Sequence, residues 1–452
     1  MVPGDVTRLL PAEPPSAGEP LDRLLDDYQR LIEPNVTHWN HPGFLAYFSS
    51  SGSGPGILGE ALAAGLSVNG MLWRTAPAAV ELEVQVCDWL RQMIDLPADF
   101  SGHINDTASI STFLALATAR DRDPALAISE RGLAGRHDLP ELVVYCSDQA
   151  HSSVDKAMIA LGLGRRGLRR LPADQAFRLD PQALIAAVAE DRRAGRRPLA
   201  VVATVGTTST TSIDPVATIA EVCAKEGMWL HVDAAWAGSA AICPEYRAQM
   251  AGIERADSLV VNPHKWLFVP MDCSVLFVRD PDLLRRTFSL VPEYLRTEPG
   301  HGAIDLMDYG IQLGRRFRAL KLWFVIRAFG LEGLQARIRE HCRLGQQLAA
   351  WIDDDAHFER LAPVPLSTVC FRARGAPGLA ANAVDDLNQR LLEATNAAGP
   401  IYLSHTVLRG RYALRLSVSN LRTEARHVQA AWELLRTMRV RVADEPAMEP
   451  ST

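Results

Sequence analysis

Two spacings of apolar residues alternate through the middle of the chain. Short apolar runs, typical of buried strands, occupy residues 142–146, 199–205, 228–232, 258–261 and 273–278. Residues 113–119, 181–189 and 216–226 instead repeat their apolar positions every three or four residues, as one face of a helix does. Strands that alternate with helices predict an α/β fold with a mostly parallel sheet covered by helices.

Helical spacing also marks both flanks of this region. It covers residues 21–32, 57–66 and 78–94 on one side, and 313–329, 331–349 and 423–437 on the other, with strands at 368–372 and 412–419. Residues 1–20 contain five prolines and predict an extended arm, whereas residues 121–140 predict a polar surface loop. We therefore divide the chain into an arm and wall segment (1–55), a large domain (56–325) and a small α+β domain (326–452).

The composition favours an ordinary globular enzyme. Hydrophobic residues make up 48% of the chain and charged residues 22%, and the net charge of −6 offers no basic surface for nucleic acid. The seven cysteines form no CxxC pair, which argues against a metal site or a disulfide framework and fits a reducing cytoplasm. We expect no membrane span and no signal peptide.

Two candidate catalytic side chains follow predicted strands. Asp233 comes directly after the run 228–232, and Lys265 follows the run 258–261. Taken singly, the lysine would be a solvated charge and the aspartate a helix cap. Together at the carboxyl ends of parallel strands they suit pyridoxal phosphate (PLP), which needs a lysine to hold its aldehyde as an imine and a carboxylate to keep its ring nitrogen protonated.

The residues around this pair resemble a known family. Asn262-Pro263-His264-Lys265-Trp266, with His231-Val232-Asp233 before it, is similar to the group II PLP-dependent decarboxylases, most closely the aromatic-L-amino-acid decarboxylases. The similarity extends from about residue 8 to about residue 436. It implies a fold-type I PLP enzyme (aspartate aminotransferase-like) with a small α+β C-terminal domain, working as a homodimer with shared active sites.

The resemblance also assigns residues to the cofactor. Residues 107–109 match the phosphate cup, and His151 matches a histidine that lies on the PLP ring, with Ala235 on the opposite face. Asp106 stands where the family usually has glycine, which places an extra carboxylate beside the phosphate. The implied cofactor contacts are Thr107, Ala108, Ser109, His151, Thr208, Asp233, Ala235, Asn262, His264 and Lys265.

A second set of residues is implied for the substrate. The aromatic stretch near residues 38–50 matches one wall of the substrate pocket, and residues 69–71 match a segment that completes the pocket of the neighbouring subunit. These matches give Trp39, Tyr47, Phe48, Ser50, Asn69 and Met71. Arg415 could hold the substrate carboxylate or form an ordinary salt bridge. Tyr294, in the Pro- and Gly-punctuated stretch 287–310, matches a proton donor on a closing loop.

The function implied is decarboxylation of an aromatic L-amino acid to its amine and carbon dioxide, with Lys265, Asp233, His151 and Tyr294 as catalytic residues. An aldehyde-forming enzyme of the same family is a first alternative, which the presence of Tyr294 and His151 disfavours. Decarboxylation of an acidic amino acid is a second, disfavoured by the aromatic wall. A PLP-binding protein with little activity is a third, and Asp106 is a feature that favours it.

Overall fold

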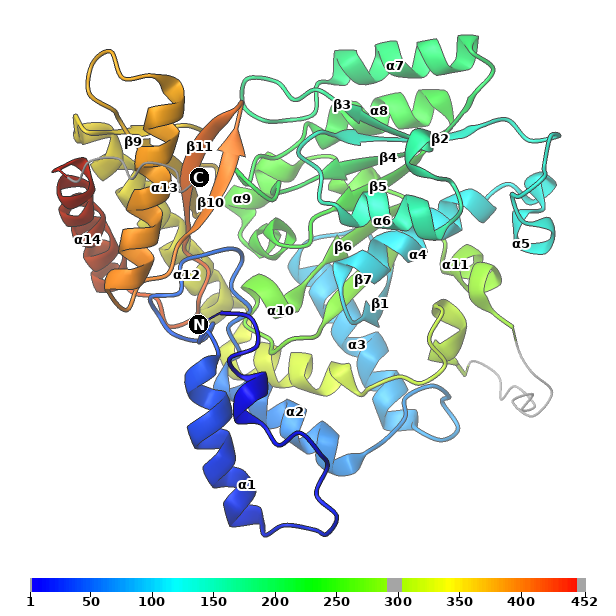
Figure 1. Ribbon diagram of the computed structural model, residues 1–452. Helices are drawn as coiled ribbons and strands as arrows, with labels where there is room; N and C mark the ends of the chain where they lie inside the picture. Colours follow the sequence, from blue (N-terminus) through cyan, green and yellow to red (C-terminus); the bar gives the residue numbers. More distant parts are fainter. Residues whose placement is uncertain (1, 291–302, 445–452) are drawn as a thin grey trace.

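The large domain is built on one seven-stranded sheet. The computed structural model describes residues 2–290 and 303–444 (Figure 1). The sheet has the order β1-β7-β6-β5-β4-β2-β3. Its strands are β1 (Ser101–Asn105), β2 (Leu142–Ser147), β3 (Leu168–Leu171), β4 (Arg197–Thr204), β5 (Trp229–Asp233), β6 (Ser258–Val261) and β7 (Ser274–Val278). Strands β3, β2, β4, β5 and β6 run parallel, and β7 pairs antiparallel with both of its neighbours, β6 and β1, so that β7 alone in this sheet runs in the opposite direction. The predicted mostly parallel sheet is therefore confirmed.

Helices cover both faces of this sheet because successive strand residues point to opposite sides. Val201 and Ala203 of β4 face a core shared with α3 (Pro77–Met93), α7 (Pro181–Arg193) and α8 (Val216–Glu226). Ala200 and Val202 face the opposite core, shared with α4 (Ala108–Asp121) and α6 (Ser153–Ala160). The strands are apolar on both faces, so they appear in the sequence as continuous apolar runs.

Local capping sets several helix limits. Asp180 accepts a hydrogen bond from the Gln182 backbone N–H at the start of α7, and Asp280 accepts one from Leu283 at the start of α11 (Pro281–Phe288). Such caps contribute about 0.5–2 kcal/mol each. At the C-terminal end of α8, Gly227 adopts φ +67°, a left-handed conformation that glycine takes at little cost.

The small domain packs a four-stranded antiparallel sheet against helices. The sheet order is β10-β11-β9-β8, with β8 (Phe358–Arg360), β9 (Thr368–Ala373), β10 (Ser404–Leu408) and β11 (Arg411–Ser417). Its helices are α13 (Ala381–Ala398) and α14 (Ala425–Asp444), together with the end of α12 (Arg318–Asp354). Helix α12 runs across the predicted domain boundary at 325/326 and breaks at Gly330, where φ is +64°. The predicted helix at 313–317 is wrong, because α12 begins only at Arg318.

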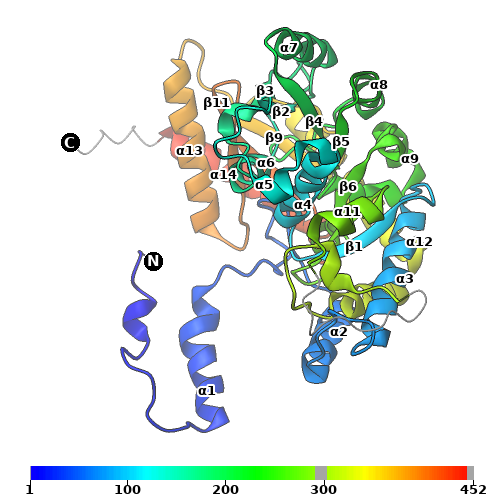
Figure 2. The same ribbon diagram turned by 90° about the vertical axis from the view of Figure 1, so that its right-hand side faces the viewer.

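The N-terminal segment stands away from the body of the molecule. It contains a 3₁₀ turn (Thr7–Leu9), α1 (Leu21–Asp27), a π-helical turn (Tyr28–Ile32) and a further 3₁₀ turn (Glu33–Asn35), before α2 (Gly54–Leu66) packs on α12. Figures 1 and 2 both show α1 projecting beyond the two domains. The prediction of a wholly extended arm is wrong at Thr7–Leu9.

Residues 121–140 are not purely a surface loop either. They contain a 3₁₀ turn (Pro124–Leu126) and α5 (Ile128–Arg131), and the apolar side chains of Leu126 and Ile128 are buried. Those two side chains join the core beside α4 and α6. In the part of the chain that the structure describes, no helix is long and apolar enough to cross a membrane.

Candidate active site

The predicted lysine and carboxylate lie at the carboxyl ends of adjacent strands. Asp233 is the last residue of β5, and Lys265 lies in the short helix α10 (Pro263–Trp266) that follows β6. Strands β5 and β6 are parallel neighbours, with Asp233 paired to Val260. Burial lowers the pKa of Lys265, the charge of Asp233 opposes this, and Arg415 lowers the pKa further. The two strand ends therefore bring a lysine and a carboxylate within electrostatic reach.

The lysine content of the chain makes this assignment sharper. The sequence contains only four lysines. Lys156 and Lys225 are exposed to solvent. Lys321 is buried, but its Nζ lies 2.6 Å from a carboxylate oxygen of Glu60. Of the four, Lys265 alone is half-buried at the carboxyl edge of the sheet, which leaves it as the candidate for an imine with an aldehyde.

Backbone contacts fix the turn that carries Lys265. The Asn262 N–H donates to the Ala235 carbonyl at 2.9 Å, and the Lys265 N–H donates to the Asn262 carbonyl at 2.9 Å. Nδ1 of His264 accepts the Cys273 N–H at 2.9 Å, and burial lowers the pKa of His264 to about 3. A neutral His264 thus joins the Lys265 turn to the start of β7.

Asp233 at the end of β5 and His151 in the loop after β2 lie near Lys265. Asp233 is 6% exposed, and its Oδ1 accepts the Ala235 N–H at 3.1 Å. His151 follows β2, and its Nδ1 accepts the Ser153 N–H at 3.1 Å, so Nε2 carries the proton of the neutral ring. Desolvation lowers the pKa of His151, Asp233 raises it and Lys265 lowers it. These electrostatic contacts place His151 in the same site.

The start of α4 suits an anionic group. Thr107 is the N-cap residue in an extended conformation, and among the described residues its side chain makes no capping hydrogen bond. The first N–H groups of a helix lack partners within it, so those of Ala108 and Ser109 are suited to bind a phosphate. Together with Lys265 and Asp233, this helix start fits PLP.

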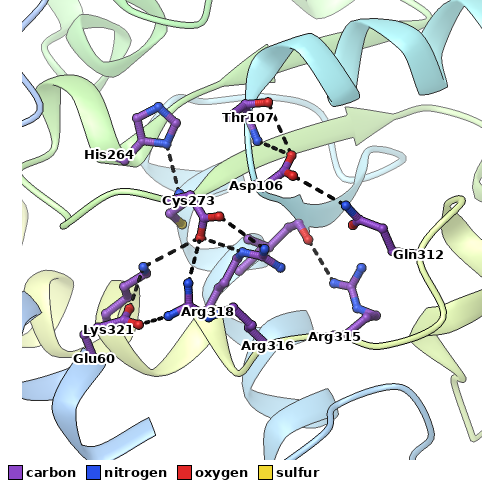
Figure 3. A network of polar contacts seen from close by, with 12 residues as sticks. Glu60, Asp106, Thr107, His264, Cys273, Gln312, Arg315, Arg316, Arg318 and Lys321 are labelled. Atoms are coloured by element: carbon purple, nitrogen blue, oxygen red, sulfur yellow. Dashed lines mark hydrogen bonds and ion pairs between the residues drawn. The ribbon is translucent and has the colours of Figure 1, made fainter. Parts of the chain in front are cut away.

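Asp106 lies directly beside this helix start (Figure 3). Its Oδ1 accepts the Thr107 N–H at 2.5 Å, and its Oδ2 accepts from Nε2 of Gln312 at 3.4 Å. The Asp106 charge is also one of the influences that raise the pKa of Arg318. Its carboxylate is therefore held by protein groups.

A network of ion pairs among α12, α2 and Asp272 lies near Asp106 and His264. Arg318 Nε lies 2.9 Å from Oδ1 of Asp272, and Lys321 and Arg316 both pair with Glu60 (Figure 3). The pairs tie the start of α12 to α2 and to the residue before Cys273, which in turn contacts His264. Buried charges are costly unless paired, so removing one partner destabilises the fold.

The loop after β4 meets the small domain at Arg415. Thr208, predicted to contact the cofactor, is exposed in this loop. The next carbonyl, that of Ser209, accepts Nε of Arg415 at 2.9 Å, and the Tyr47 carbonyl accepts Nη1 at 2.7 Å. Nη2 is buried and has no hydrogen-bond partner among the described residues. Arg415 is 4% exposed, and burial lowers its pKa to about 10, so it stays cationic at neutral pH.

The predicted substrate wall forms an aromatic cluster. The rings of Trp39 and Tyr47 stack with centroids 5.7 Å apart, and those of Trp39 and Phe44 with centroids 4.6 Å apart. Phe44 in turn stacks on Tyr402. Trp39 and Tyr47 are 40% and 51% exposed, so both keep free ring surface. Ser50 is half-buried in the same segment.

Phe48 belongs to a second aromatic group that the sequence did not indicate. It stacks on Trp236 at 4.4 Å, and Trp236 stacks on Trp266 at 4.1 Å. The Trp266 indole N–H then donates to Nδ1 of His341 at 2.9 Å. The sequence places Trp266 next to Lys265, but no sequence pattern predicts its contact with His341, which lies 75 residues further along the chain.

Asn69 and Met71 contact a different part of the chain. The Oδ1 of Asn69 accepts the Arg315 N–H at 2.9 Å, and the Met71 carbonyl accepts the Met307 N–H at 3.2 Å. Their predicted role in a neighbouring subunit's site stays a prediction. Tyr294 lies outside the described residues.

Comparisons with known proteins agree with this chemistry. The conserved domain of the pyridoxal-dependent decarboxylases matches residues 3–374. Tryptophan decarboxylase 2 of Oryza sativa subsp. japonica is 41% identical over 444 residues, which cover 96% of this chain and 88% of that protein. Phenylacetaldehyde synthase of Arabidopsis thaliana is 40% identical, with 96% and 89% covered. The crystal structure of Oryza sativa TDC with PLP and tryptamine has a TM-score of 0.93 at 38% identity, covering 98% of this chain and 93% of that one. The chain therefore belongs to the group II PLP-dependent decarboxylases, close to the aromatic amino-acid decarboxylases, and its cofactor is pyridoxal 5'-phosphate.

Proposed function

We propose that this protein removes the carboxylate of an aromatic L-amino acid, such as tryptophan, tyrosine, phenylalanine or a hydroxylated relative, and releases the amine and carbon dioxide. One observation carries this proposal: a buried, cationic Arg415 with one unpartnered nitrogen stands next to exposed stacked rings. The cation suits the α-carboxylate. The rings of Trp39 and Tyr47 suit a flat apolar side chain and offer no charge to an acidic one.

The cofactor would be held by groups from several strands. Lys265 would bind its aldehyde, Asp233 its ring nitrogen, and the start of α4 its phosphate, with His151 against the ring. When bound, PLP supplies a cationic ring that accepts the electron pair released as carbon dioxide leaves. The lowered pKa of Lys265 increases the fraction of its amine that is neutral, which favours reaction with a carbonyl and exchange of a proton with the substrate amine.

Arg415 would orient the substrate. A guanidinium that holds the carboxylate fixes the direction of the Cα–carboxylate bond relative to the groups on β5 and β6. Tyr294 would deliver a proton to Cα after carbon dioxide has left, and closure of its loop would exclude water and oxygen.

The decisive experiment exploits the small number of lysines. Borohydride reduction of the holoenzyme, followed by peptide mapping, should place the cofactor mass on Lys265 among four candidates. Lys265→Ala should reduce amine and carbon dioxide release to background, and Lys156→Ala, which changes an exposed lysine, serves as its control. A cofactor mass on Lys321, which is buried, would overturn the assignment.

Aldehyde formation is the second candidate, favoured by the 40% identity to a phenylacetaldehyde synthase. In that reaction the amino acid, oxygen and water give the aldehyde, carbon dioxide, ammonia and hydrogen peroxide. The tyrosine in the sequence at position 294 favours the amine, because a phenol can protonate Cα before oxygen reacts. Tyr294→Phe should slow amine release and produce measurable aldehyde and peroxide. Unchanged amine output without peroxide would assign the proton to another group, with His151 next to test.

The active form in this proposal is a homodimer in the cytoplasm. In α1, Leu21, Leu24 and Leu25 share one face and are 68%, 47% and 52% exposed. In α2, Leu58 and Leu62 are 52% and 46% exposed on another shared face. Two uncovered apolar helix faces suit a second copy of the chain. Sedimentation of the holoenzyme should give twice the chain mass of 49.5 kDa.

A further inference from the structure

The ring of Phe48 is covered on both faces. Trp236 stacks against one face, with centroids 4.4 Å apart and planes 14° apart. The guanidinium carbon of Arg415 lies over the same ring, 4.6 Å from its centroid. Because Trp236 takes one face, the guanidinium occupies the other. A substrate ring therefore reaches the edge of Phe48 and not a free face.

The residue before Phe48 completes a cradle for the same guanidinium. Tyr47 adopts φ +50°, a left-handed conformation that is unusual for a residue with a side chain. At this turn its carbonyl accepts Nη1 of Arg415, while the next side chain lies under the guanidinium plane. With Nε bound to the Ser209 carbonyl, the free nitrogen is Nη2. The cradle thus determines which nitrogen stays available for a ligand.

The stack behind Phe48 keeps its plane fixed. Trp236 and Trp266 stack at 4.1 Å with their planes 5° apart, and both are 1% exposed or less. The hydrogen bond from Trp266 to His341 anchors the far end in α12. A flat group on top of such a stack has little freedom to tilt, so the orientation of Phe48 passes directly to Arg415.

We propose that Phe48 is a positioning residue for Arg415: it holds the guanidinium so that Nη2 meets the substrate carboxylate. This inference rests on the carboxylate role of Arg415 in the proposed function. A guanidinium that binds the carboxylate before it leaves stabilises the bound substrate as well as the transition state. Loss of the Phe48 ring should therefore raise KM and leave kcat less affected.

The test compares two inhibitors that share a ring and differ in the carboxylate. The pair is a 3-arylpropionate and the corresponding arylethylamine, assayed on holoenzyme with indole, phenol and phenyl rings. A cation–π contact of about 0.5–2 kcal/mol corresponds to roughly 2- to 30-fold in affinity. Phe48→Leu should weaken the propionates by about this factor and leave the amines nearly unchanged. Phe48→Tyr, which keeps the ring, should restore most of the selectivity for the carboxylate.

The neighbouring Tyr47 supplies a matched control. Glycine tolerates φ +50°, so Tyr47→Gly keeps the carbonyl that binds Arg415 and removes only the exposed ring. This variant should weaken propionate and amine in parallel, as loss of a ring wall does. If Phe48→Leu also weakens both in parallel, weakens the amine alone, or changes neither, the positioning role is wrong.

A double-mutant cycle separates this inference from the proposed function. In an Arg415→Met background, Phe48→Leu should add almost no further loss of propionate affinity, because its effect passes through the guanidinium. An undiminished loss overturns the inference. If Arg415→Met alone leaves propionate binding unchanged, the carboxylate role itself fails and the inference with it. Circular dichroism and cofactor content check folding, and Phe48→Met replaces the leucine variant if that one does not fold.

Discussion

Burial of His341 makes the free energy of unfolding of this protein decrease as the pH falls below 6.5. The side chain is 2% exposed, and its Nδ1 accepts the Trp266 indole N–H. Burial lowers its pKa to about 4, while Glu340 and the Asn420 backbone oppose the change. In the unfolded chain a histidine titrates near 6.5. Above pH 6.5 the ring is neutral in both states, so its titration costs nothing there.

Below pH 6.5 the unfolded chain takes up the proton first. The free energy of unfolding therefore falls with pH until the folded ring also protonates near pH 4. Between pH 7 and pH 5, a folded pKa of about 4 against 6.5 corresponds to a loss of about 2 kcal/mol at this one residue. Protonated Nδ1 can no longer accept from Trp266, so the turn that carries Lys265 loses its support from α12 only near pH 4, where the folded ring itself takes up the proton.

His341→Gln removes the titration and keeps an oxygen that can accept the indole N–H. We expect the variant to lose about 2 kcal/mol less unfolding free energy than the wild type between pH 7 and pH 5. Urea unfolding followed by tryptophan fluorescence at both pH values measures this difference. His357→Gln, at an exposed position, should behave like the wild type. Equal losses in wild type and His341→Gln would refute the reasoning.

Three further predictions concern the site itself. Asp233→Ala should lower kcat/KM by roughly 10²–10⁴-fold, as removal of a positioned proton-handling group does, and a PLP analogue with a permanently charged ring nitrogen should restore part of it; full activity would exclude the pyridinium role. Asp106→Gly removes a carboxylate that lies beside the helix start proposed to bind the phosphate of PLP. A charge at a helix terminus changes the interaction energy by about 0.3–1 kcal/mol, so PLP should bind the apoenzyme roughly 2- to 5-fold more tightly in a fluorescence titration. Unchanged or weaker binding would contradict this prediction. Mixed dimers of Lys265→Ala and Tyr294→Phe chains should regain amine formation if sites are shared, with mass analysis confirming exchange; mixtures as inactive as either parent would show that the loop serves its own subunit.

The sequence was most informative where one physical constraint dominates. Strands buried on both faces are continuous apolar runs, and so β2, β4, β5, β6 and β7 were predicted to within about two residues at each end. Lys265 and Asp233 were singled out because PLP chemistry needs both groups at strand ends, and the structure brings these two strand ends together. Strand β1 was missed because its residues Ser101–Asn105 include polar side chains whose partners come from α3 and the 303–317 segment.

Contacts between distant residues left no such pattern. The apolar spacing of residues 21–32 predicts a helix with a buried face, yet Leu21, Leu24 and Leu25 are exposed in the single chain. Periodicity indicates that a face needs covering and does not indicate by what. Arg415 is similar: its strand was predicted, but its two carbonyl partners lie more than 200 residues earlier, and no local pattern encodes them.

In the proposed function the two domains contribute different groups to the reaction, so the contacts between the domains matter. Asp233 ends β5 and Lys265 lies in α10 after β6, both in the large domain, whereas Arg415 comes from β11 of the small domain. Arg415 would fix the direction of the Cα–carboxylate bond, so an angular error between the domains would become an angular error in the bond that breaks. Arg415 is bound to carbonyls before α2 and after β4, and Phe48 stacks on Trp236 after β5. These contacts tie the guanidinium to the loop after β4 and, through Phe48, to Trp236 after β5, so they oppose a rotation of the small domain relative to Asp233 and Lys265.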